Sequence, residues 1–442
     1  MRAVILLAAG AGLLLATDAR MIDAIKRRDH KAVNALVAAH ADINAAEPDG
    51  ATPLAWATYL DDTETAKLLL ASGAKVKTAD EYGETPLTLA CANGNAALVT
   101  KYIQAGADVN AARWDGETAL MIAANTGNPE VVKELIAHGA KVDAADARKG
   151  QTALMWAAAE GHADVVDLLI KSGAPVNAAS KSGFNALVFA AVKDDVKSVQ
   201  SLLAAGADSN YALPDGTKVL LVAASHKSTK AAGALVDGGA NPNVADRAGN
   251  TPLHTAAQLG SVDLIEKLLA KGATVDARTA KSNFAGRGGG GGFRFAPAGE
   301  QTALMMAAKA DKPDAMKALV KGGADPKLKA QDGSTLLMFA AGSGHVEAVQ
   351  YAYELDPDTK AVNEQKSTAM HFAVTGTGAV PQPELCKVVE FLASKGTPLN
   401  DPDARGRTPF EICDPIPLDQ VQAVLTKLIV AAGGEPPKSR RK

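Results

Sequence analysis

The chain has 442 residues, of which 47% are hydrophobic and 4% aromatic, and its formal net charge is −3. A single hydrophobic core seldom grows to this size, so the length predicts either several domains or an array of repeats. The balance of 46 basic and 49 acidic residues creates no strong field for attracting DNA or an anionic membrane, so nucleic acid is not expected as a partner.

Residues 1–19 have the three-part layout of a secretory signal peptide. Arg2 precedes an apolar run from Ala3 to Ala16, and cleavage is expected between Ala19 and Arg20. The run is shorter than the roughly 20 residues that span a bilayer as a helix, and no membrane span is expected in the mature chain. The expected location is the periplasm or the outside of the cell. A hydrophobic helix that stays uncleaved on a cytoplasmic protein is the alternative.

Two short motifs recur in phase beyond this segment. The Thr position of a Gly-x-Thr-Pro-Leu motif returns at intervals of 33, 33, 34, 33, 33, 33, 51, 33, 33 and 40 residues. Its occurrences are Thr52, Thr85, Thr118, Thr152, Asn185, Lys218, Thr251, Thr302, Thr335, Thr368 and Thr408. Gly-Ala-Asp-Val-Asn or a near variant follows at Gly106, Gly139, Gly173, Gly206, Gly239, Gly272 and Gly323. Two independent motifs with one spacing predict a repeat array.

Each part of the motif has a local structural reason. The Thr hydroxyl caps a first helix by accepting a backbone N–H, and the following Pro has the backbone geometry of a first helical position. Leu54 and Ala57 then continue with helical spacing. A second helix, read from Val131 to Ile136, ends at Gly139. Pairs such as Asp115-Gly116 predict tight turns at the tips of short hairpins.

These residues resemble the ankyrin repeat, through Thr-Pro-Leu at 52–54, 85–87 and 251–253 and Gly-Ala-Asp-Val-Asn at 106–110. The resemblance covers about residues 20–432. It implies an all-α repeat solenoid of helix-turn-helix units with β-hairpin fingers, about twelve repeats in all. The departures affect single caps and turns. Asn185 and Lys218 replace the Thr, and Glu300 and Lys366 replace the turn Gly.

The motifs divide residues 20–435 into a solenoid with modified ends, because terminal units must face water. The capping units are expected at 20–47 and 404–435. The repeats are expected at about 48–80, 81–113, 114–147, 148–180, 181–213, 214–246, 247–279, 298–330, 331–363 and 364–403. The interval of 51 places a Gly-rich insert, 280–297, at a hairpin tip, as a flexible linker or as an adaptable contact arm. Residues 436–442 form a basic tail.

In the family that the sequence resembles, partners are held by the hairpin tips and the exposed ends of the first helices, which line the concave side. Aromatic and Arg residues, which dominate interface hot spots, are frequent at these positions. The partner-binding candidates are Tyr59, Tyr82, Trp114, Arg148, Lys149, Lys181, Phe184, Arg247, Arg405 and Arg407, with Arg287, Phe293, Arg294 and Phe295 in the insert. Further first-helix positions of this kind are Asn125, Glu160, Lys193 and His226.

No catalytic or metal-binding pattern was found. The three cysteines have no metal-ligand spacing, and no His-Glu-x-x-His or Gly-x-Ser-x-Gly motif occurs. Cys91 and Cys413 are expected to be small buried residues, with a Cys386–Cys413 bridge as an alternative in an oxidising compartment. His254 and His371 are expected to bond to neighbouring turns.

The sequence therefore predicts a monomeric, non-enzymatic scaffold without cofactor or metal, which binds a protein or peptide partner on the concave face. A cell-envelope structural or glycan-recognising element is the first alternative. A cytosolic regulator that keeps its N-terminus is the second.

Overall fold

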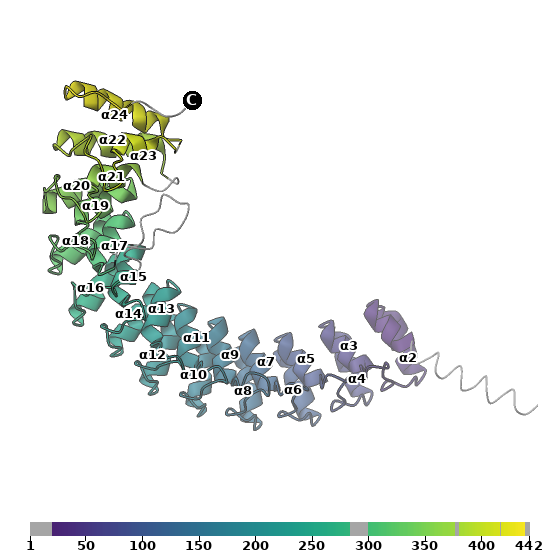
Figure 1. Ribbon diagram of the computed structural model, residues 1–442. Helices are drawn as coiled ribbons and strands as arrows, with labels where there is room; N and C mark the ends of the chain where they lie inside the picture. Colours follow the sequence, from purple (N-terminus) through teal and green to yellow (C-terminus); the bar gives the residue numbers. More distant parts are fainter. Residues whose placement is uncertain (1–19, 283–298, 376–379, 416, 438–442) are drawn as a thin grey trace, which may run out of the picture. The chain divides into compact units, whose positions relative to one another are not determined.

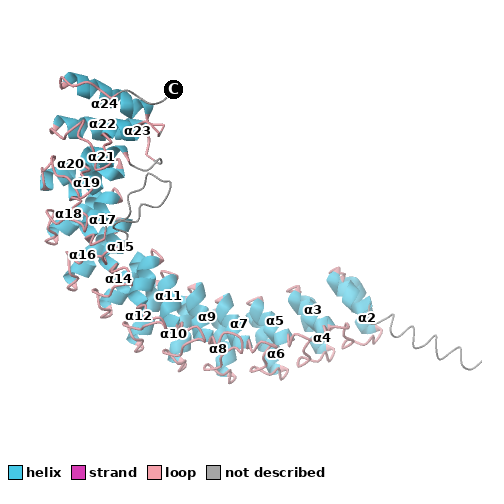
Figure 2. Ribbon diagram, in the orientation of Figure 1, coloured by secondary structure: helices cyan, strands magenta, loops and turns pink. Residues whose placement is uncertain are grey.

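The computed structural model describes residues 20–282, 299–375, 380–415 and 417–437. The expected signal peptide lies outside the described residues, as do Arg287, Phe293, Arg294 and Phe295 of the insert and residues 438–442 of the tail. Helices joined by turns and loops make up the described part, and Figure 2 shows no strand in it. It divides into two compact units on either side of the Gly216–Thr217 bond.

The first unit is built from helix pairs in two layers (Figure 1). After a helix over residues 20–26, the first helices of the pairs are α3 (Pro53–Tyr59), α5 (Pro86–Ala92), α7 (Ala119–Thr126), α9 (Ala153–Glu160) and α11 (Ala186–Val192). The second helices are α2 (His30–Ala38), α4 (Thr63–Ala71), α6 (Ala96–Gln104), α8 (Pro129–Ala137), α10 (Ala163–Lys171) and α12 (Val196–Ala204). First helices pack on first helices and second on second, so each pair completes the core of its neighbour.

The second unit repeats this arrangement. Its first helices are α13 (Val219–Ser225), α15 (Pro252–Leu259), α17 (Ala303–Lys309), α19 (Leu336–Ser343), α21 (Ala369–Val374) and α23 (Pro409–Cys413). Its second helices are α14 (Thr229–Asp237), α16 (Val262–Ala270), α18 (Pro313–Lys321), α20 (Val346–Leu355), α22 (Gln382–Ser394) and α24 (Asp419–Ala431). The fold is thus the all-α repeat solenoid that the motif spacing predicts.

The first helices begin where the capping residues predict. Thr52 Oγ1 accepts a hydrogen bond from the Ala55 amide at 3.2 Å, which satisfies one of the free N–H groups of the first turn. Asn185 retains the cap, since its Oδ1 accepts from the Val188 amide at 3.0 Å. Lys218 does not supply a side-chain cap, and α13 begins without that hydrogen bond.

Small residues let the first helices approach closely in the core. Leu54 is 1% exposed and Ala57 is fully buried, and the same Leu and Ala positions are buried in the other repeats. Cys91 and Cys413 are also fully buried, as the sequence predicts, whereas Cys386 is partly exposed. The structure records all three as thiols, and burial raises the pKa of the Cys91 thiol.

The hairpins, called fingers below, are shorter than the expected β-hairpins. A finger is closed by a few backbone bonds, such as those from the Glu47 amide to the Ala51 carbonyl at 2.9 Å and from the Gly50 amide to the Glu47 carbonyl at 2.8 Å. Among the described residues, β pairing is limited to the bridges of Ala112 with Thr118 and of Ala145 with Thr152. Arms of two or three residues are too short for a ladder.

Backbone hydrogen bonds also connect each finger to the next, and this connected row is called the finger ridge. In the first unit, amides of residues 81, 114, 147 and 181 donate to the carbonyls of 49, 82, 115 and 149 at 2.7, 3.1, 2.8 and 2.8 Å. In the second unit, amides of 280, 331, 364 and 404 donate to the carbonyls of 248, 299, 332 and 365 at 2.7 to 2.9 Å. The fingers of each unit are therefore held in a fixed register.

The Glu and Lys that replace the turn Gly retain the turn. Glu300 and Lys366 adopt φ of 55° and 54°, the left-handed conformation for which Gly is preferred. Near Glu300, the described beginning of the insert, residues 280–282, lies on the finger ridge. The Ser282 backbone N–H donates to Gln331 Oε1 at 2.7 Å. The Gln331 side-chain nitrogen Nε2 donates back to the Ser282 carbonyl at 3.2 Å.

Two buried histidines join neighbouring repeats in the second unit, as predicted. His254 Nδ1 accepts from the Thr251 amide at 3.1 Å, and Nε2–H donates to the Gln301 carbonyl at 3.0 Å. His371 makes the equivalent bonds to Thr368 and to the Arg407 carbonyl, at 3.1 and 3.2 Å. This pattern requires a neutral ring that carries its proton on Nε2.

We expect the second unit to lose stability on mild acidification. Burial lowers the pKa of His254 and of His371 below the ordinary value, so the unfolded chain, with a His pKa of about 6.5, takes up protons first as the pH falls. The stabilisation is complete above about pH 6.5 and decreases below it. The measurement is Tm between about pH 7.5 and about pH 5.5.

The control for this prediction is the exposed His226 of the same unit. A His254→Gln/His371→Gln variant should be less stable at neutral pH but should have a smaller fall in Tm, whereas His226→Gln should retain the full fall. An unchanged fall in the double variant would contradict the assignment.

Candidate partner-binding face

Exposed aromatic side chains gather on one face of the first unit. Tyr59, Tyr82 and Trp114 are 61, 56 and 66% exposed, and the other large hydrophobic side chains recorded as exposed in the described residues are both Val. Tyr82 and Trp114 lie on neighbouring fingers, and Tyr59 lies at the end of α3. The finger ridge and the adjoining first helices thus carry the exposed side chains that are most typical of interface hot spots.

Three cations, Arg148, Lys149 and Lys181, lie on the two fingers that follow Trp114 and are called the basic patch below. All three are exposed. The Arg148 guanidinium lies 5.8 Å from the centre of the Trp114 ring, a cation–π geometry. Lys181 Nζ donates to the Ala147 carbonyl at 2.6 Å, which holds this side chain along the ridge.

The salt bridges in this part of the unit use other cations, namely Arg113, Lys193 and Lys197. The basic patch therefore faces solvent without a salt bridge to a described carboxylate. The two fingers that precede Arg113 are acidic instead, with Asp49 on one and Asp80 and Glu81 on the other. A hydrogen bond and the charge of Glu81 raise the pKa of Tyr82.

Two of the predicted tip residues lie at the base of their fingers. Phe184 is half-buried with its ring 5.6 Å from that of Phe189, and its carbonyl accepts from the Ser180 amide at 2.8 Å. The Arg407 guanidinium donates twice to Asp403 Oδ2, at 3.1 and 2.7 Å. The Phe184 backbone and the Arg407 side chain thus stabilise their own hairpins, whereas the Phe184 ring packs on α11.

The remaining predicted tip residues of the second unit, Arg247 and Arg405, are exposed on their fingers. They belong to the second unit and are not part of the aromatic and basic cluster of the first. Arg287, Phe293, Arg294 and Phe295 lie outside the described residues.

A stripe of residues along the first helices was missed by the sequence reasoning. It occupies the fourth residue after each helix cap, which lies beside the finger ridge. In the first unit the stripe consists of Trp56, Leu89, Ile122, Trp156 and Phe189, and in the second unit of Val222, Thr255, Met306, Phe339, Phe372 and Ile412. Many of these side chains are partly exposed. The signal was available, because large residues recur here while the neighbouring core positions hold Leu and Ala.

Trp56 shows what an indole at this position binds within the chain itself. Its Nε1–H donates to Glu47 Oε2 at 2.6 Å, and Lys26 Nζ forms a 2.6 Å salt bridge to Glu47 Oε1. Lys26 Nζ also lies 4.1 Å from the indole centre, and the Tyr59 ring packs edge-on against Trp56 at 5.6 Å. This end of the face is therefore an internally satisfied cluster.

Trp156 occupies the same position in a groove between α7 and α9. The groove is lined by Ala92, Arg113, Glu117, Met121, Ile122, Asn125, Thr126 and Trp156. Arg113 forms salt bridges to Glu84 of the preceding finger and, at 2.8 Å, to Glu117 of its own. Burial disfavours the charged guanidinium, but the bonds and charges of Glu84 and Glu117 outweigh it and raise the Arg113 pKa.

Two buried donors of the side chains that line this groove have no acceptor among the described residues. Arg113 Nε and Trp156 Nε1 are buried atoms without a hydrogen-bond partner in the described part of the chain. Buried polar atoms are nearly always paired, and an unpaired one costs about 1–3 kcal/mol. Neither donor atom is exposed, so an acceptor reaches them only after a lining side chain moves.

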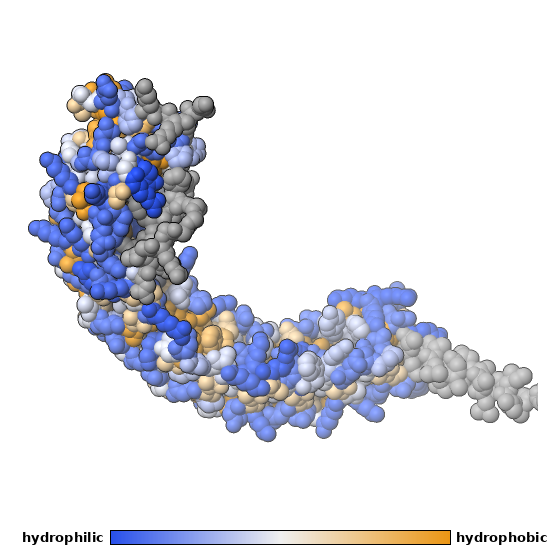
Figure 3. Space-filling model, in the orientation of Figure 1, coloured by the Kyte–Doolittle hydropathy of each residue, from blue (hydrophilic) through white to orange (hydrophobic). Residues whose placement is uncertain are grey.

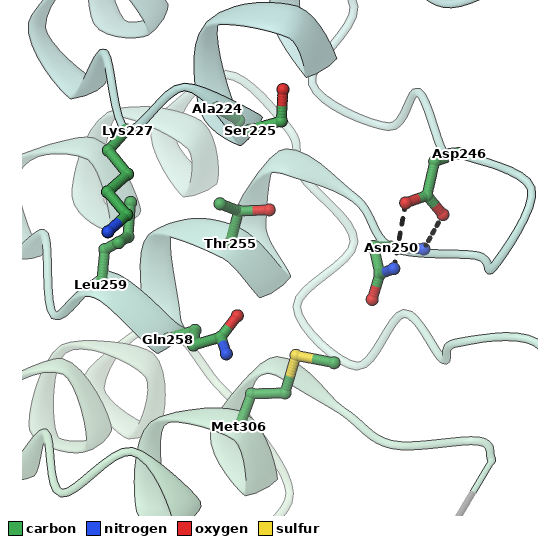
Figure 4. A pocket seen from close by; sticks show the side chains of 9 residues that line it. All are labelled: Ala224, Ser225, Lys227, Asp246, Asn250, Thr255, Gln258, Leu259 and Met306. Carbon is green, nitrogen blue, oxygen red and sulfur yellow. Dashed lines mark hydrogen bonds between the residues drawn. The ribbon is translucent and has the colours of Figure 1, made fainter. Parts of the chain in front are cut away.

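A groove of the same kind lies in the second unit, between α13, α15 and α17 (Figure 4). Its lining includes Lys227, Thr255, Gln258 and Met306, so two stripe residues, Thr255 and Met306, face it. The Asp246 carboxylate accepts from the Asn250 amide and side chain at 2.8 and 3.0 Å, and it is thereby committed to its own finger. The stripe and the fingers form similar grooves in both units.

No helix in the described residues is long and apolar enough to cross a membrane. No group of three or more His, Cys, Asp or Glu side chains in the described ranges is arranged to hold a metal ion.

The comparison with known families agrees with the repeat geometry. The family model described as ankyrin repeats, in three copies, matches residues 21–113, 90–180, 187–279 and 304–403, most of the chain. No curated protein matches the sequence. The paired helices, the connected fingers and these four matches together show that the chain belongs to the ankyrin-repeat family.

Proposed function

We propose that the chain is a non-catalytic scaffold that binds a protein or peptide partner on the finger ridge and first helices of its first unit. Ankyrin repeats generally mediate protein–protein interaction. The observation that supports this face is the exposure of Tyr82 and Trp114, at 56 and 66%, beside three cations without a described carboxylate partner. Burying two such rings contributes to affinity.

The layer of second helices has a different surface. Ion pairs between neighbouring second helices, such as Lys267–Asp237 at 2.6 Å and Lys321–Glu266 at 3.2 Å, join exposed side chains. Exposed pairs of this kind contribute little energy. Figure 3 shows hydrophilic residues over most of the visible surface, with hydrophobic residues in small separate patches. The exposed aromatic residues on the fingers of the first unit therefore distinguish the proposed face.

The test is affinity capture with a finger variant and a matched control. Trp114→Ala/Tyr82→Ala removes the two exposed rings, and Lys67→Ala/Lys133→Ala changes two exposed residues on α4 and α8. We expect the wild type and the control to recover one stoichiometric protein and the finger variant to lose it, with equal Tm for all three. Equal recovery by the finger variant would refute this face. Binding to purified cell wall alone, or sedimentation as large homopolymers, would favour a structural or glycan-recognising element.

We also propose that residues 1–19 are removed during export to the periplasm or the outside of the cell. The charged residue Arg2 and the apolar run to Ala16 support this proposal. We expect N-terminal sequencing of the protein from the envelope fraction to begin at Arg20, and Leu13→Arg/Leu14→Arg to leave a full-length chain in the cytosol. A wild-type protein that retains Met1 and stays in the cytosol would instead indicate a cytosolic regulator.

A further inference from the structure

Two buried hydrogen-bond donors at the groove between α7 and α9, Arg113 Nε and Trp156 Nε1, have no acceptor among the described residues. Trp156 and Trp56 occupy the same position in their repeats, but the Trp56 N–H is bound by the Glu47 carboxylate at 2.6 Å, whereas the buried Trp156 Nε1 has no partner among the described residues. The residue of the fourth finger that corresponds to Glu47 is the shorter Asp146, whose carboxylate accepts from the Lys149 and Gln151 amides at 2.6 and 2.7 Å. The carboxylate that would complete this site is therefore missing from the repeat itself.

Positive charge that could attract an anion lies on one side of the groove only. Arg148, Lys149 and Lys181 are exposed on the two fingers that follow the groove. On the other side, Arg113 is paired with two carboxylates, Glu84 and Glu117, so that side of the groove carries no excess positive charge. The finger after Lys181 carries Asp215. The basic patch is thus a short cationic segment of the ridge between acidic neighbours.

The groove also has an apolar floor. Met121 and Ile122 are 1 and 8% exposed, and both line it together with the partly exposed Trp156. Such a floor takes a single apolar side chain, while the rim supplies the polar contacts. A ligand with alternating apolar and acidic groups would satisfy the floor, the two donors and the patch together.

We propose that the groove and the basic patch bind an acidic, extended peptide segment. One apolar side chain packs on Ile122 and Trp156, an oxygen of the peptide accepts hydrogen bonds from the donors of the groove after a lining side chain shifts to admit it, and carboxylates face the basic patch. This inference rests on the proposed function, since it names the chemistry of the partner at that face.

The length of the patch favours a peptide over a nucleic acid. A nucleic-acid strand that continued along the ridge past Trp114 would pass Tyr82 and the acidic finger of Asp80, Glu81 and Glu84. A nucleic acid carries a negative charge at every phosphate and would be repelled there, whereas a peptide can carry carboxylates at one end and neutral or basic residues at the other.

The test uses three fluorescent peptides of equal length that share a central Leu and Phe and have Glu, Gln or Lys flanks. Anisotropy with the full chain should show the Glu peptide binding about tenfold more tightly than the Gln peptide at low salt, and the Lys peptide most weakly. This preference should decrease as salt is raised, because exposed charges are screened. Arg148→Ala/Lys149→Ala/Lys181→Ala should abolish it.

The matched control is Lys67→Ala/Lys101→Ala/Lys133→Ala, which removes the same charge from exposed positions on α4, α6 and α8. It should keep the preference for Glu. Equal affinity for Glu and Gln peptides, or an equal loss in the control, would overturn the proposal. So would displacement of the peptide by a single-stranded oligonucleotide at lower concentrations than by unlabelled Glu peptide. If the chain shows no preference for the Glu peptide while capture of a partner still requires Trp114, this inference alone is wrong and the proposed function stands.

Discussion

Gly116→Ala is expected to lower the free energy of unfolding by about 2–4 kcal/mol, from backbone strain and from overpacking together. Gly116 has φ of 86°, and a Cβ built on it would lie 2.6 Å from the Ala147 backbone nitrogen. That nitrogen donates to the Asp115 carbonyl at 2.8 Å, so the methyl group would separate two adjacent fingers. Urea unfolding followed by circular dichroism measures the loss.

Gly139→Ala is the matched control. Gly139 has nearly the same φ, 89°, but no atom lies within 4 Å of a built Cβ. Its replacement should cost only the strain of a left-handed Ala, about 1–2 kcal/mol. The difference between the two variants measures how strongly the finger ridge contributes to stability. Equal losses would mean that finger-to-finger contacts contribute little.

Arg113→Met should destabilise the first unit by about 1–3 kcal/mol, because it leaves two partly buried carboxylates without their cationic partner. The Arg113, Glu84 and Glu117 side chains are only 25, 19 and 21% exposed. Met retains most of the apolar packing of the Arg stem. Urea unfolding of the variant against the wild type gives the change.

Glu84→Gln/Glu117→Gln separates charge from packing in this cluster. Added to Arg113→Met, it should restore part of the lost stability, because no uncompensated charge then remains. Losses that simply add would show that the three side chains do not act as one unit. Lys193→Met, which breaks the more exposed 3.7 Å pair with Glu160, is expected to change stability by less than about 0.5 kcal/mol.

The parts of the fold that were predictable depend on local chemistry. A Thr or Asn before an apolar helix accepts a first-turn amide regardless of its distant surroundings, and Thr52 and Asn185 both do so. Gly139 ends its helix with φ of 89° for an equally local reason. The spacing of these signals alone is sufficient to predict a stack of helix pairs.

The binding face was only partly predictable, because it depends on contacts between repeats. Trp114 is exposed at a finger tip as expected, but Phe184 is half-buried with its ring against Phe189 of α11. The unpaired Trp156 N–H becomes evident only when its finger carboxylate is seen to bind backbone amides. Trp56 and Trp156 look alike in sequence and differ in what the adjacent finger supplies.

Site-specific photo-crosslinking in cells tests the central claim most directly, because it does not require the partner to be known in advance. Benzoylphenylalanine would replace Tyr82 or Trp114 on the fingers, and Lys67 or Lys133 on the second helices. We predict that the finger positions crosslink to one protein and that the second-helix positions do not. Crosslinks confined to positions 67 and 133 would contradict the assignment of the finger ridge as the partner-binding face.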